Sequence, residues 1–207
     1  MPHPRVAIIH YGLGNLRSVE NAFAYIGADV FIAETPADLA DASHVVLPGV
    51  GAFGDGMANL RANGWDAAMH NHAVIQQKPL LGICLGMQLL AERGTEYGDH
   101  TGLGFIKGSV EKIIPTDDTI RIPHIGWNRV EFTPGVPMYA GLSAGDDYYF
   151  VHSYALKPQD PAQITGICNH GVPFAASVAD GAIWGAQFHP EKSQHAGLTL
   201  LRNFLRV

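Results

Sequence analysis

A change of hydrophobic pattern at a single cysteine is the feature that most constrains this chain. Residues 80–83 form a short apolar run, which is typical of a buried parallel strand. Within residues 85–92, Leu85, Gln88, Leu89 and Glu92 recur at the spacing of a helix. The sequence therefore predicts a strand that turns into a helix at Cys84. Gly82 and Gly86 flank the cysteine and remove the side chains that would obstruct so sharp a turn.

The pattern Gly-x-Cys-x-Gly at a strand-to-helix turn is that of a nucleophile elbow. Such a turn lifts the sulfur of Cys84 above the sheet edge, and the helix N-terminus favours the thiolate, which is the attacking species. The alternative is that Cys84 is a small buried apolar residue, as most single cysteines are. A nucleophile would require a base from elsewhere in the chain.

The C-terminal part of the chain offers that base. A predicted strand over residues 182–188 ends at His189, and Glu191 follows two positions later, where its carboxylate can orient the imidazole. With Cys84 these residues would form a Cys-His-Glu triad. The His-x-Glu pair alone is a weak signal, because the chain has 11 histidines. Its position at a strand end, far beyond a cysteine elbow, is what favours the triad.

Length and composition exclude several classes of protein. The 207 residues fit a single domain over 1–207, and 13 basic against 19 acidic residues give a net charge of −6, which argues against nucleic-acid binding. Cys84 and Cys168 lack CxxC spacing, so neither a metal site nor a disulfide is predicted. A reducing cytoplasm fits this usage, and no apolar window is long enough to suggest a membrane partner.

The N-terminal half alternates strands and helices, which predicts a parallel sheet with right-handed crossovers. The expected strands are 6–10, 30–33, 44–47 and 80–83, and the expected helices are 16–26, 57–62, 66–75 and 85–92. Gly12 and Gly14 after the first strand imitate a dinucleotide fingerprint, but Arg17 stands where its third glycine belongs. No cofactor is therefore predicted.

From residue 104 to residue 178 the pattern changes to short alternating runs separated by turn sequences, which indicates antiparallel strands. The expected runs are 110–114, 129–132, 148–154, 164–169 and 174–178. We expect them to form one layer that extends the parallel core. The predicted fold class is therefore α/β, with a mixed, mostly parallel sheet flanked by helices and an antiparallel extension.

A glycine-rich loop follows the third strand. Residues 49–56 contain four glycines at the carboxyl end of a predicted parallel strand, where α/β proteins bind ligands. Free backbone amides in such a loop can build an oxyanion hole. An ordinary flexible loop is the alternative.

The stretch Gly-Ile-Cys-Leu-Gly-Met-Gln at residues 82–88, together with His189-Pro190-Glu191, resembles the class I glutamine amidotransferase family. The resemblance implies a flavodoxin-like fold and an enzyme that hydrolyses the side-chain amide of glutamine and passes ammonia to a synthase partner. Further stretches resemble a branch of the family whose partner is a separate (β/α)8-barrel cyclase. They are residues 11–18, 48–54, 123–128, 149–154 and 187–193, and they span nearly the whole chain.

The resemblance also implies roles for individual residues. It assigns Cys84 as nucleophile, His189 as base and then acid, and Glu191 as the group that orients it. The oxyanion hole would use backbone of Val50, Gly51 and Leu85, with Val50 contributing after a peptide flip. Implied substrate contacts are Gly49, Gln88, Glu96, Ser153 and Tyr154, and implied partner contacts are Trp127, Asn128, Tyr149 and Lys192.

Several other histidines are expected to have no chemical role. His124 and His152 have no adjacent carboxylate, so we expect them to hold loops in place. His70 and His72 lie on a predicted helix and are expected at the surface, whereas Cys168 is expected to be a buried strand residue.

Two other functions stay open at this point. A stand-alone cysteine hydrolase or thiol protease could use the same elbow and would be fully active without a partner. A catalytically idle scaffold that only binds the cyclase is the second alternative, and the intact set of Cys84, His189 and Glu191 argues against it.

Overall fold

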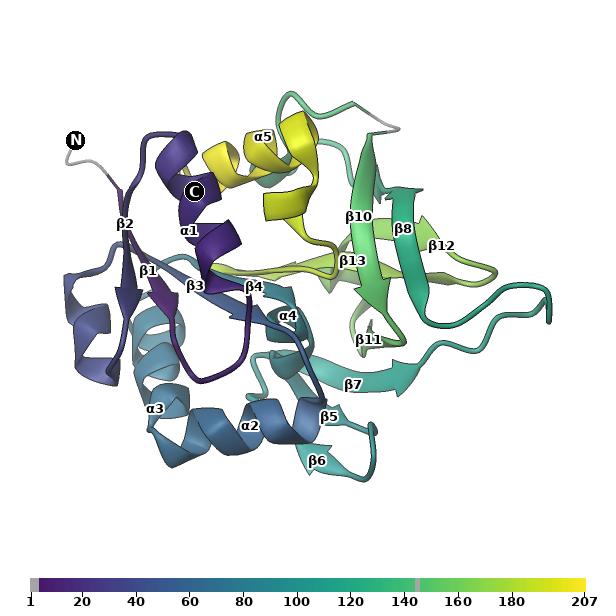
Figure 1. The fold of residues 1–207 in the computed structure, drawn as a ribbon, viewed down its shortest axis with the longest axis horizontal. Helices are drawn as coiled ribbons and strands as arrows, with labels where there is room; N and C mark the ends of the chain where they lie inside the picture. Colours follow the sequence, from purple (N-terminus) through teal and green to yellow (C-terminus); the bar gives the residue numbers. More distant parts are fainter. Residues whose placement is uncertain (1–3, 144–145) are drawn as a thin grey trace.

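The computed structural model describes residues 4–143 and 146–207, and its centre is an eight-stranded sheet (Figure 1). Its strands lie in the order β2 (Asp29–Ala33), β1 (Arg5–Ile9), β3 (His44–Gly49), β4 (Leu80–Cys84), β14 (Ile183–Ala186), β13 (Pro173–Asp180), β12 (Ile164–Asn169) and β9 (Glu131–Phe132). The first five are parallel, and the remaining three continue the sheet with antiparallel pairs. The predicted mixed sheet with a parallel core is confirmed.

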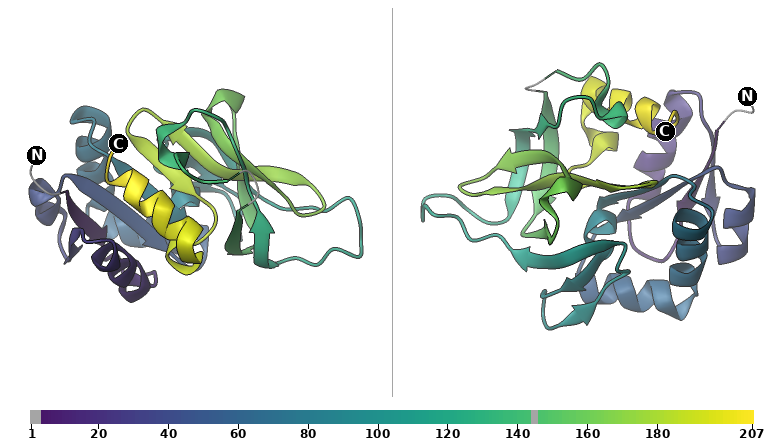
Figure 2. Two further views of the ribbon diagram at one scale, coloured as in Figure 1. Left: turned by 90° about the horizontal axis from the view of Figure 1, so that it is seen from above. Right: turned by 180° about the vertical axis from the view of Figure 1, so that it is seen from behind.

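Helices cover both faces of the parallel half, as Figure 2 shows. One face packs against α1 (Leu16–Tyr25) and α5 (Gln194–Phe204), and the other packs against α2 (Phe53–Ala62) and α3 (Trp65–Met69). Strand residues alternate between these faces, so Ile8 belongs to the α1 and α5 side and Ile9 to the α2 and α3 side. The continuous apolar runs of the parallel strands therefore fill two separate cores.

The start and end of α1 follow local signals in the sequence. Asn15 caps the helix, because its side-chain oxygen accepts a hydrogen bond of 3.3 Å from the backbone amide of Ser18. Gly27 follows the last turn with φ of +85°, a left-handed conformation that glycine adopts without strain. Within the described residues, no helix is long and apolar enough to cross a membrane.

The antiparallel strands do not form the single layer that the sequence predicted. Only β13, β12 and β9 extend the central sheet. The others form a four-stranded sheet of β11 (Tyr154–Pro158), β7 (Ile106–Lys112), β5 (Ala91–Gly94) and β6 (His100–Thr101), and a two-stranded ribbon of β10 (Asp147–His152) and β8 (His124–Arg129). The predicted strand 148–154 is divided at Ser153, because β10 pairs with β8 whereas β11 pairs with β7.

Two predicted helices differ from the observed ones. The helix expected over 85–92 is the short α4 (Leu85–Leu89), and β5 begins two residues later, so Glu92 lies in a strand. The helix expected over 66–75 is α3 followed by a π-helical turn, η2 (His70–Ile75). Short 3₁₀ helices complete the chain: η1 (Pro36–Asp41), η3 (Pro137–Tyr139), η4 (Pro161–Gln163) and η5 (Pro190–Lys192).

The wide π turn explains why the predicted surface position of His72 is wrong. A π turn changes the angular spacing of its side chains, so a face predicted from α-helical geometry does not apply there. His72 is buried, and its Nε2 lies 3.3 Å from the Pro79 carbonyl oxygen. Burial lowers the pKa of His72 to about 4, so the ring is neutral at neutral pH. Its neighbour His70 is exposed, and Cys168 is buried, both as predicted.

The turn at Cys84 depends on two close approaches of backbone. A β-carbon added at Gly82 would lie 2.6 Å from the Gly86 carbonyl oxygen, and one added at Gly86 would lie 1.8 Å from the Leu47 carbonyl oxygen. The glycines therefore let α4 pack directly on β4 and β3. Cys84 itself has φ of 54° and ψ of −111°, a conformation that a non-glycine residue keeps only when its surroundings enforce it. The predicted elbow is confirmed.

Gly86→Ala should lower the free energy of unfolding by more than about 3 kcal/mol, because the new methyl group meets rigid backbone instead of a flexible side chain. Chemical denaturation with both proteins at one pH measures the difference. Gly27→Ala is the control. No atom lies within 4 Å of its added β-carbon, and only left-handed backbone strain of about 1–2 kcal/mol is expected. Equal losses for the two variants would contradict the close-approach explanation.

Candidate active site

A cavity of about 320 Å³ opens at the carboxyl ends of β3 and β4, the edge where α/β sheets bind ligands. Its lining joins the elbow, the glycine loop and the ends of β10 and β11. The lining residues are Val50, Gly51, Cys84, Leu85, Gln88, Glu96, Pro123, Val151, His152, Ser153 and Tyr154. A larger apolar cavity of about 420 Å³ lies between β7, β11, β12 and β13 and contains none of the predicted catalytic residues.

The sulfur of Cys84 lies at this cavity and is only slightly accessible, since the residue is 6% exposed. The side-chain nitrogen of Gln187 and the backbone oxygen of Val151 each lie 3.9 Å from the sulfur. Because α4 begins at Leu85, the sulfur is beside a helix N-terminus whose first amides have no acceptor within the helix. A nucleophile with limited solvent access and nearby donors is the arrangement that the elbow predicted.

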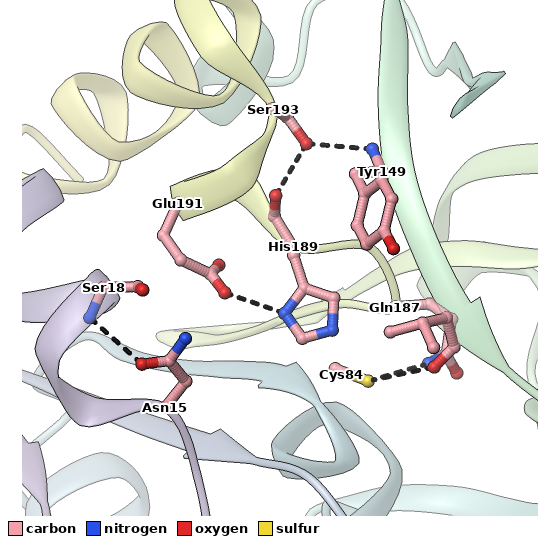
Figure 3. Close-up of polar contacts among 9 residues, drawn as sticks. Asn15, Ser18, Cys84, Tyr149, Gln187, His189, Glu191 and Ser193 are labelled. Carbon is pink, nitrogen blue, oxygen red and sulfur yellow. Dashed lines mark hydrogen bonds and ion pairs between the residues drawn. The ribbon is translucent and has the colours of Figure 1, made fainter. Parts of the chain in front are cut away.

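His189 and Glu191 form a buried pair on the chain segment that follows β14 (Figure 3). The imidazole Nδ1 lies 2.8 Å from a Glu191 carboxylate oxygen, and the two side chains are 3% and 1% exposed. Among the described residues, the Nε2 atom and the second carboxylate oxygen have no hydrogen-bond partner. Glu191 therefore holds one ring nitrogen, and the other nitrogen is left to exchange a proton.

The backbone of His189 is linked to Tyr149 of β10 directly and through Ser193. Its amide donates to the Tyr149 carbonyl oxygen at 2.9 Å. The buried Ser193 hydroxyl donates to the His189 carbonyl oxygen at 2.6 Å and accepts from the Tyr149 amide at 3.0 Å (Figure 3). The imidazole is therefore positioned by β10 as well as by its own segment.

The charge state of His189 follows from opposing effects on its pKa. Burial lowers the pKa of His189, whereas the nearby Cys84 side chain and the hydrogen bond and negative charge of Glu191 raise it, and the result is about 9. This value is above the ordinary 6.5, so the ring carries a positive charge at neutral pH. An imidazolium beside the cysteine can supply a proton to a leaving group.

The oxyanion-hole candidates lie at the end of β3 and the start of α4, beside Cys84. Val50 and Gly51 line the cavity with Leu85, and Gly49 pairs with Cys84 in the β3–β4 ladder. A β-carbon at Gly49 would lie 2.4 Å from the buried Tyr11 hydroxyl, so this position has no space for a side chain. The glycine loop is thus ordered against the elbow at Gly49.

Four of the five predicted substrate contacts line the cavity, whereas Gly49 does not, and Gln88 and Glu96 also have structural partners. The Gln88 side-chain nitrogen donates to the Tyr154 carbonyl oxygen at 2.9 Å, and Ser153 lies beside Tyr154 in the lining. Glu96 accepts a hydrogen bond of 3.0 Å from the Phe53 amide, which is the first residue of α2. Glu96 therefore caps a helix while its side chain borders the cavity.

The predicted partner contacts separate into two groups. Trp127 and Tyr149 face each other across the β8–β10 ribbon with ring centroids 6.1 Å apart, and the Lys192 ammonium lies 5.7 Å from the Tyr149 ring centroid. Asn128 follows Trp127 and points to the other face of the ribbon, where it donates to the Asn169 carbonyl oxygen at 2.9 Å.

Two residues of this site were missed by the sequence reasoning. Gln187 is fully buried and contacts Cys84, and strand alternation could have revealed it, because it lies two residues before His189. Tyr11 packs its hydroxyl against Gly49, and burial followed by the nearby charge of Cys84 raises its pKa. No local pattern predicts that contact, since it depends on how β1 and β3 are placed.

With this geometry established, comparison with known proteins identifies the family. Residues 7–207 match the family described as glutamine amidotransferase class-I. Two solved structures from Thermotoga maritima share the fold at 18% identity. They are a PurLQS structure, with a TM-score of 0.78 and coverage of 99% of this chain and 98% of the other, and a glutamine amidotransferase, with a TM-score of 0.70 and full coverage of both. The chain therefore belongs to the class I glutamine amidotransferase family.

Curated relatives define the branch of that family. Imidazole glycerol phosphate synthase subunit HisH 1 of Campylobacter jejuni strain RM1221 is 48% identical over 98% of this chain and 100% of its own length. The HisH subunits of Rhodospirillum rubrum and Moorella thermoacetica are each 44% identical, over 98% and 96% of this chain and 98% and 93% of their own lengths. Within the amidotransferases the chain falls among the HisH subunits of imidazole glycerol phosphate synthase.

Removing the sulfur should change the titration of the base. In Cys84→Ala the pKa of His189 should fall from about 9 toward its ordinary 6.5, because the effect of the neighbouring Cys84 side chain is lost while burial and Glu191 remain. Imidazole NMR signals followed against pH measure the shift, and unchanged titration of the exposed histidines is the control. A His189 pKa that is the same in both proteins would show that the two side chains do not interact.

Proposed function

We propose that Cys84, His189 and Glu191 carry out the glutamine hydrolysis of this chain. As a HisH-type class I amidotransferase, the chain is the glutaminase subunit of an imidazole glycerol phosphate synthase, which serves histidine biosynthesis. The observation that supports the assignment of residues is the strained Cys84 elbow beside the buried His189–Glu191 pair. These are the parts that nucleophilic catalysis on an amide requires.

In the proposed first half-reaction the Cys84 thiolate attacks the side-chain carbonyl carbon of glutamine. The His189 imidazolium then gives its proton to the amide nitrogen, the carbon–nitrogen bond breaks, and ammonia leaves while a thioester remains on Cys84. In the second half-reaction the neutral imidazole takes a proton from water, which attacks the thioester. Collapse of this intermediate releases glutamate and restores the thiolate and the imidazolium.

Negative charge develops on the carbonyl oxygen in both half-reactions. We assign its stabilisation to the Leu85 amide at the start of α4 and to the Val50 amide after a flip of the peptide that follows Gly49. Gly49 and Gly51 flank Val50 and permit such a local change of backbone. If the amide faces away from the cavity in the free chain, glutaminase activity stays low until a partner binds.

The remaining lining residues are the proposed contacts for the amino-acid end of glutamine. Backbone of Ser153 and Tyr154 and the side chains of Gln88 and Glu96 border the cavity away from Cys84. Because the Gln88 nitrogen is engaged by Tyr154, its side-chain oxygen is the group left for the substrate ammonium. Glu96 supplies a carboxylate for the same positive group.

HisH chains are subunits of a complex, and we propose that the partner is a (β/α)8-barrel cyclase that docks on the exposed face of the β8–β10 ribbon. Ile125, Trp127 and Val151 on this face are 60%, 49% and 37% exposed, and Tyr149 completes the row. Val151 also lines the cavity. A subunit that covers this face would therefore cover the mouth of the active site, and Lys192 lies beside it to contact the partner.

A covered mouth has a chemical consequence for ammonia. Ammonia released into water is protonated and lost as a nucleophile, whereas ammonia passed into the partner stays reactive. The cyclase would combine it with its nucleotide substrate to give imidazole glycerol phosphate and AICAR. We place the reaction in the cytoplasm, because Cys84 acts only as a reduced thiol and both cysteines are unpaired.

Glutamate release from glutamine should be strongly stimulated by a purified cyclase subunit with its nucleotide substrate analogue, compared with this chain alone. The reason is that docking completes the oxyanion hole and closes the cavity. Equal turnover in both samples would favour the stand-alone hydrolase, and no turnover in either would favour the idle scaffold.

Cys84→Ala should abolish glutamine-dependent synthesis in the complex, with a loss of at least about 10³-fold, because no thioester can form. Synthesis from added ammonium salts should be retained, since that route bypasses Cys84. Both rates are measured on one preparation of the complex. Loss of the ammonium-dependent rate as well would mean that the substitution damages the complex and does not isolate the nucleophile.

A further inference from the structure

The buried face of the β8–β10 ribbon carries a chain of side-chain hydrogen bonds. The Asn128 side-chain nitrogen lies 3.2 Å from His124 Nε2, and His124 Nδ1 lies 3.0 Å from His152 Nε2. His152 Nδ1 lies 2.8 Å from the Tyr154 carbonyl oxygen. His124 and His152 are directly opposite each other in the ribbon register, so the two strands hold their rings in contact.

The series of hydrogen bonds continues from Tyr154 to Cys84. The Gln88 side-chain nitrogen donates to the Tyr154 carbonyl oxygen and also to the Gln187 side-chain oxygen, at 2.9 and 3.0 Å. The Gln187 nitrogen in turn lies 3.9 Å from the sulfur of Cys84. Hydrogen bonds therefore connect the ribbon to the reacting sulfur without a gap.

The direction of every bond is determined by its neighbours. A backbone carbonyl only accepts, so Tyr154 requires a proton on His152 Nδ1 and leaves Nε2 of that ring as the acceptor. His124 must then carry its proton on Nδ1 and accept at Nε2 from Asn128. At the far end the Asn128 oxygen accepts from the Arg129 amide at 2.8 Å, which orients the side-chain nitrogen toward His124 independently.

The surroundings keep these rings neutral and closely packed. Burial, followed by the charges of neighbouring histidines, lowers the pKa of His124 to about 3. Burial lowers the pKa of His152 to about 4 despite its bond to Tyr154. His124 stacks between Phe150 and His170, with centroids 4.7 and 4.1 Å away. Among the described residues, no three potential ligands are placed to hold a metal ion.

We propose that His124 and His152 are positioning residues that orient Gln88 and the Tyr154 backbone around bound glutamine, and that Asn128 sets the direction of their hydrogen bonds. The inference rests on the proposed function, because it concerns the same cavity. On this inference the Asn128 side chain acts on the buried face of the ribbon and does not contact the partner subunit. When the partner docks and moves the ribbon, these hydrogen bonds transmit the movement to Gln88, because their donors and acceptors have only one allowed arrangement.

The first test needs no activity. Ring-nitrogen NMR of the ¹⁵N-labelled free chain should show both His124 and His152 as neutral rings protonated at Nδ1 at pH 7. Asn128→Asp should convert His124 to an imidazolium. The new carboxylate requires a proton on His124 Nε2, while His152 Nε2 still requires a proton on His124 Nδ1. Protonation at Nε2 of either neutral ring in the unmodified chain would overturn the proposal.

The second test measures positioning in the complex with saturating cyclase. His124→Phe keeps the stacked ring but removes both hydrogen bonds, and it should raise the KM for glutamine by about tenfold with a smaller change in kcat. His170→Phe is the matched control, since His170 stacks on His124 outside the chain of bonds, and its KM should be unchanged. An unchanged KM in His124→Phe, or equal changes in both variants, would overturn the positioning role.

The two tests separate this inference from the proposed function. If the unmodified complex does not hydrolyse glutamine, the proposed function fails, and the NMR result still decides the hydrogen-bond arrangement. Thermal unfolding of each variant shows whether a loss reflects misfolding. If His124→Phe does not fold, Asn128→Asp carries the kinetic test through the same KM, and a KM equal to that of the unmodified complex would then overturn the proposal.

Discussion

The closeness of α4 to β3 and β4 is the constraint on which the rest of the structure depends. At Gly86 the helix backbone lies so near the Leu47 carbonyl that even a methyl group has no space. This approach forces the chain through the strained conformation of Cys84 and puts the sulfur at the open edge of the sheet. His189, the glycine loop and the cavity walls are all arranged around that one sulfur.

The parallel half of the fold, the Cys84 elbow and the position of the His189–Glu191 pair could be predicted because their signals are local. A buried parallel strand is a continuous apolar run, and the elbow and the His-x-Glu pair each lie within a few residues. The antiparallel half was predicted less well, because alternation indicates a strand without indicating its neighbour. The division at Ser153 illustrates this, since one continuous alternating run supplies strands to two different sheets.

The misplaced side chains have related causes. His72 was assigned by α-helical geometry to a segment that forms a π turn, and Glu92 was assigned to a helix that ends early. Gln187 and Tyr11 act through contacts between distant strands, which only the assembled sheet creates. The hydrogen bonds of Asn128 could not be predicted for the same reason, because Trp127 is exposed on one face of β8 while Asn128 forms bonds on the other.

The double attachment of Tyr149 to the His189 segment has a consequence for inhibition. The ring of Tyr149 lies beside Trp127, and its backbone holds His189 directly and through Ser193. A small molecule wedged between these two rings would not need to resemble glutamine or to enter the cavity. By bending β10 it would displace His189, so the surface of this enzyme offers an inhibitor site separate from the glutamine cavity.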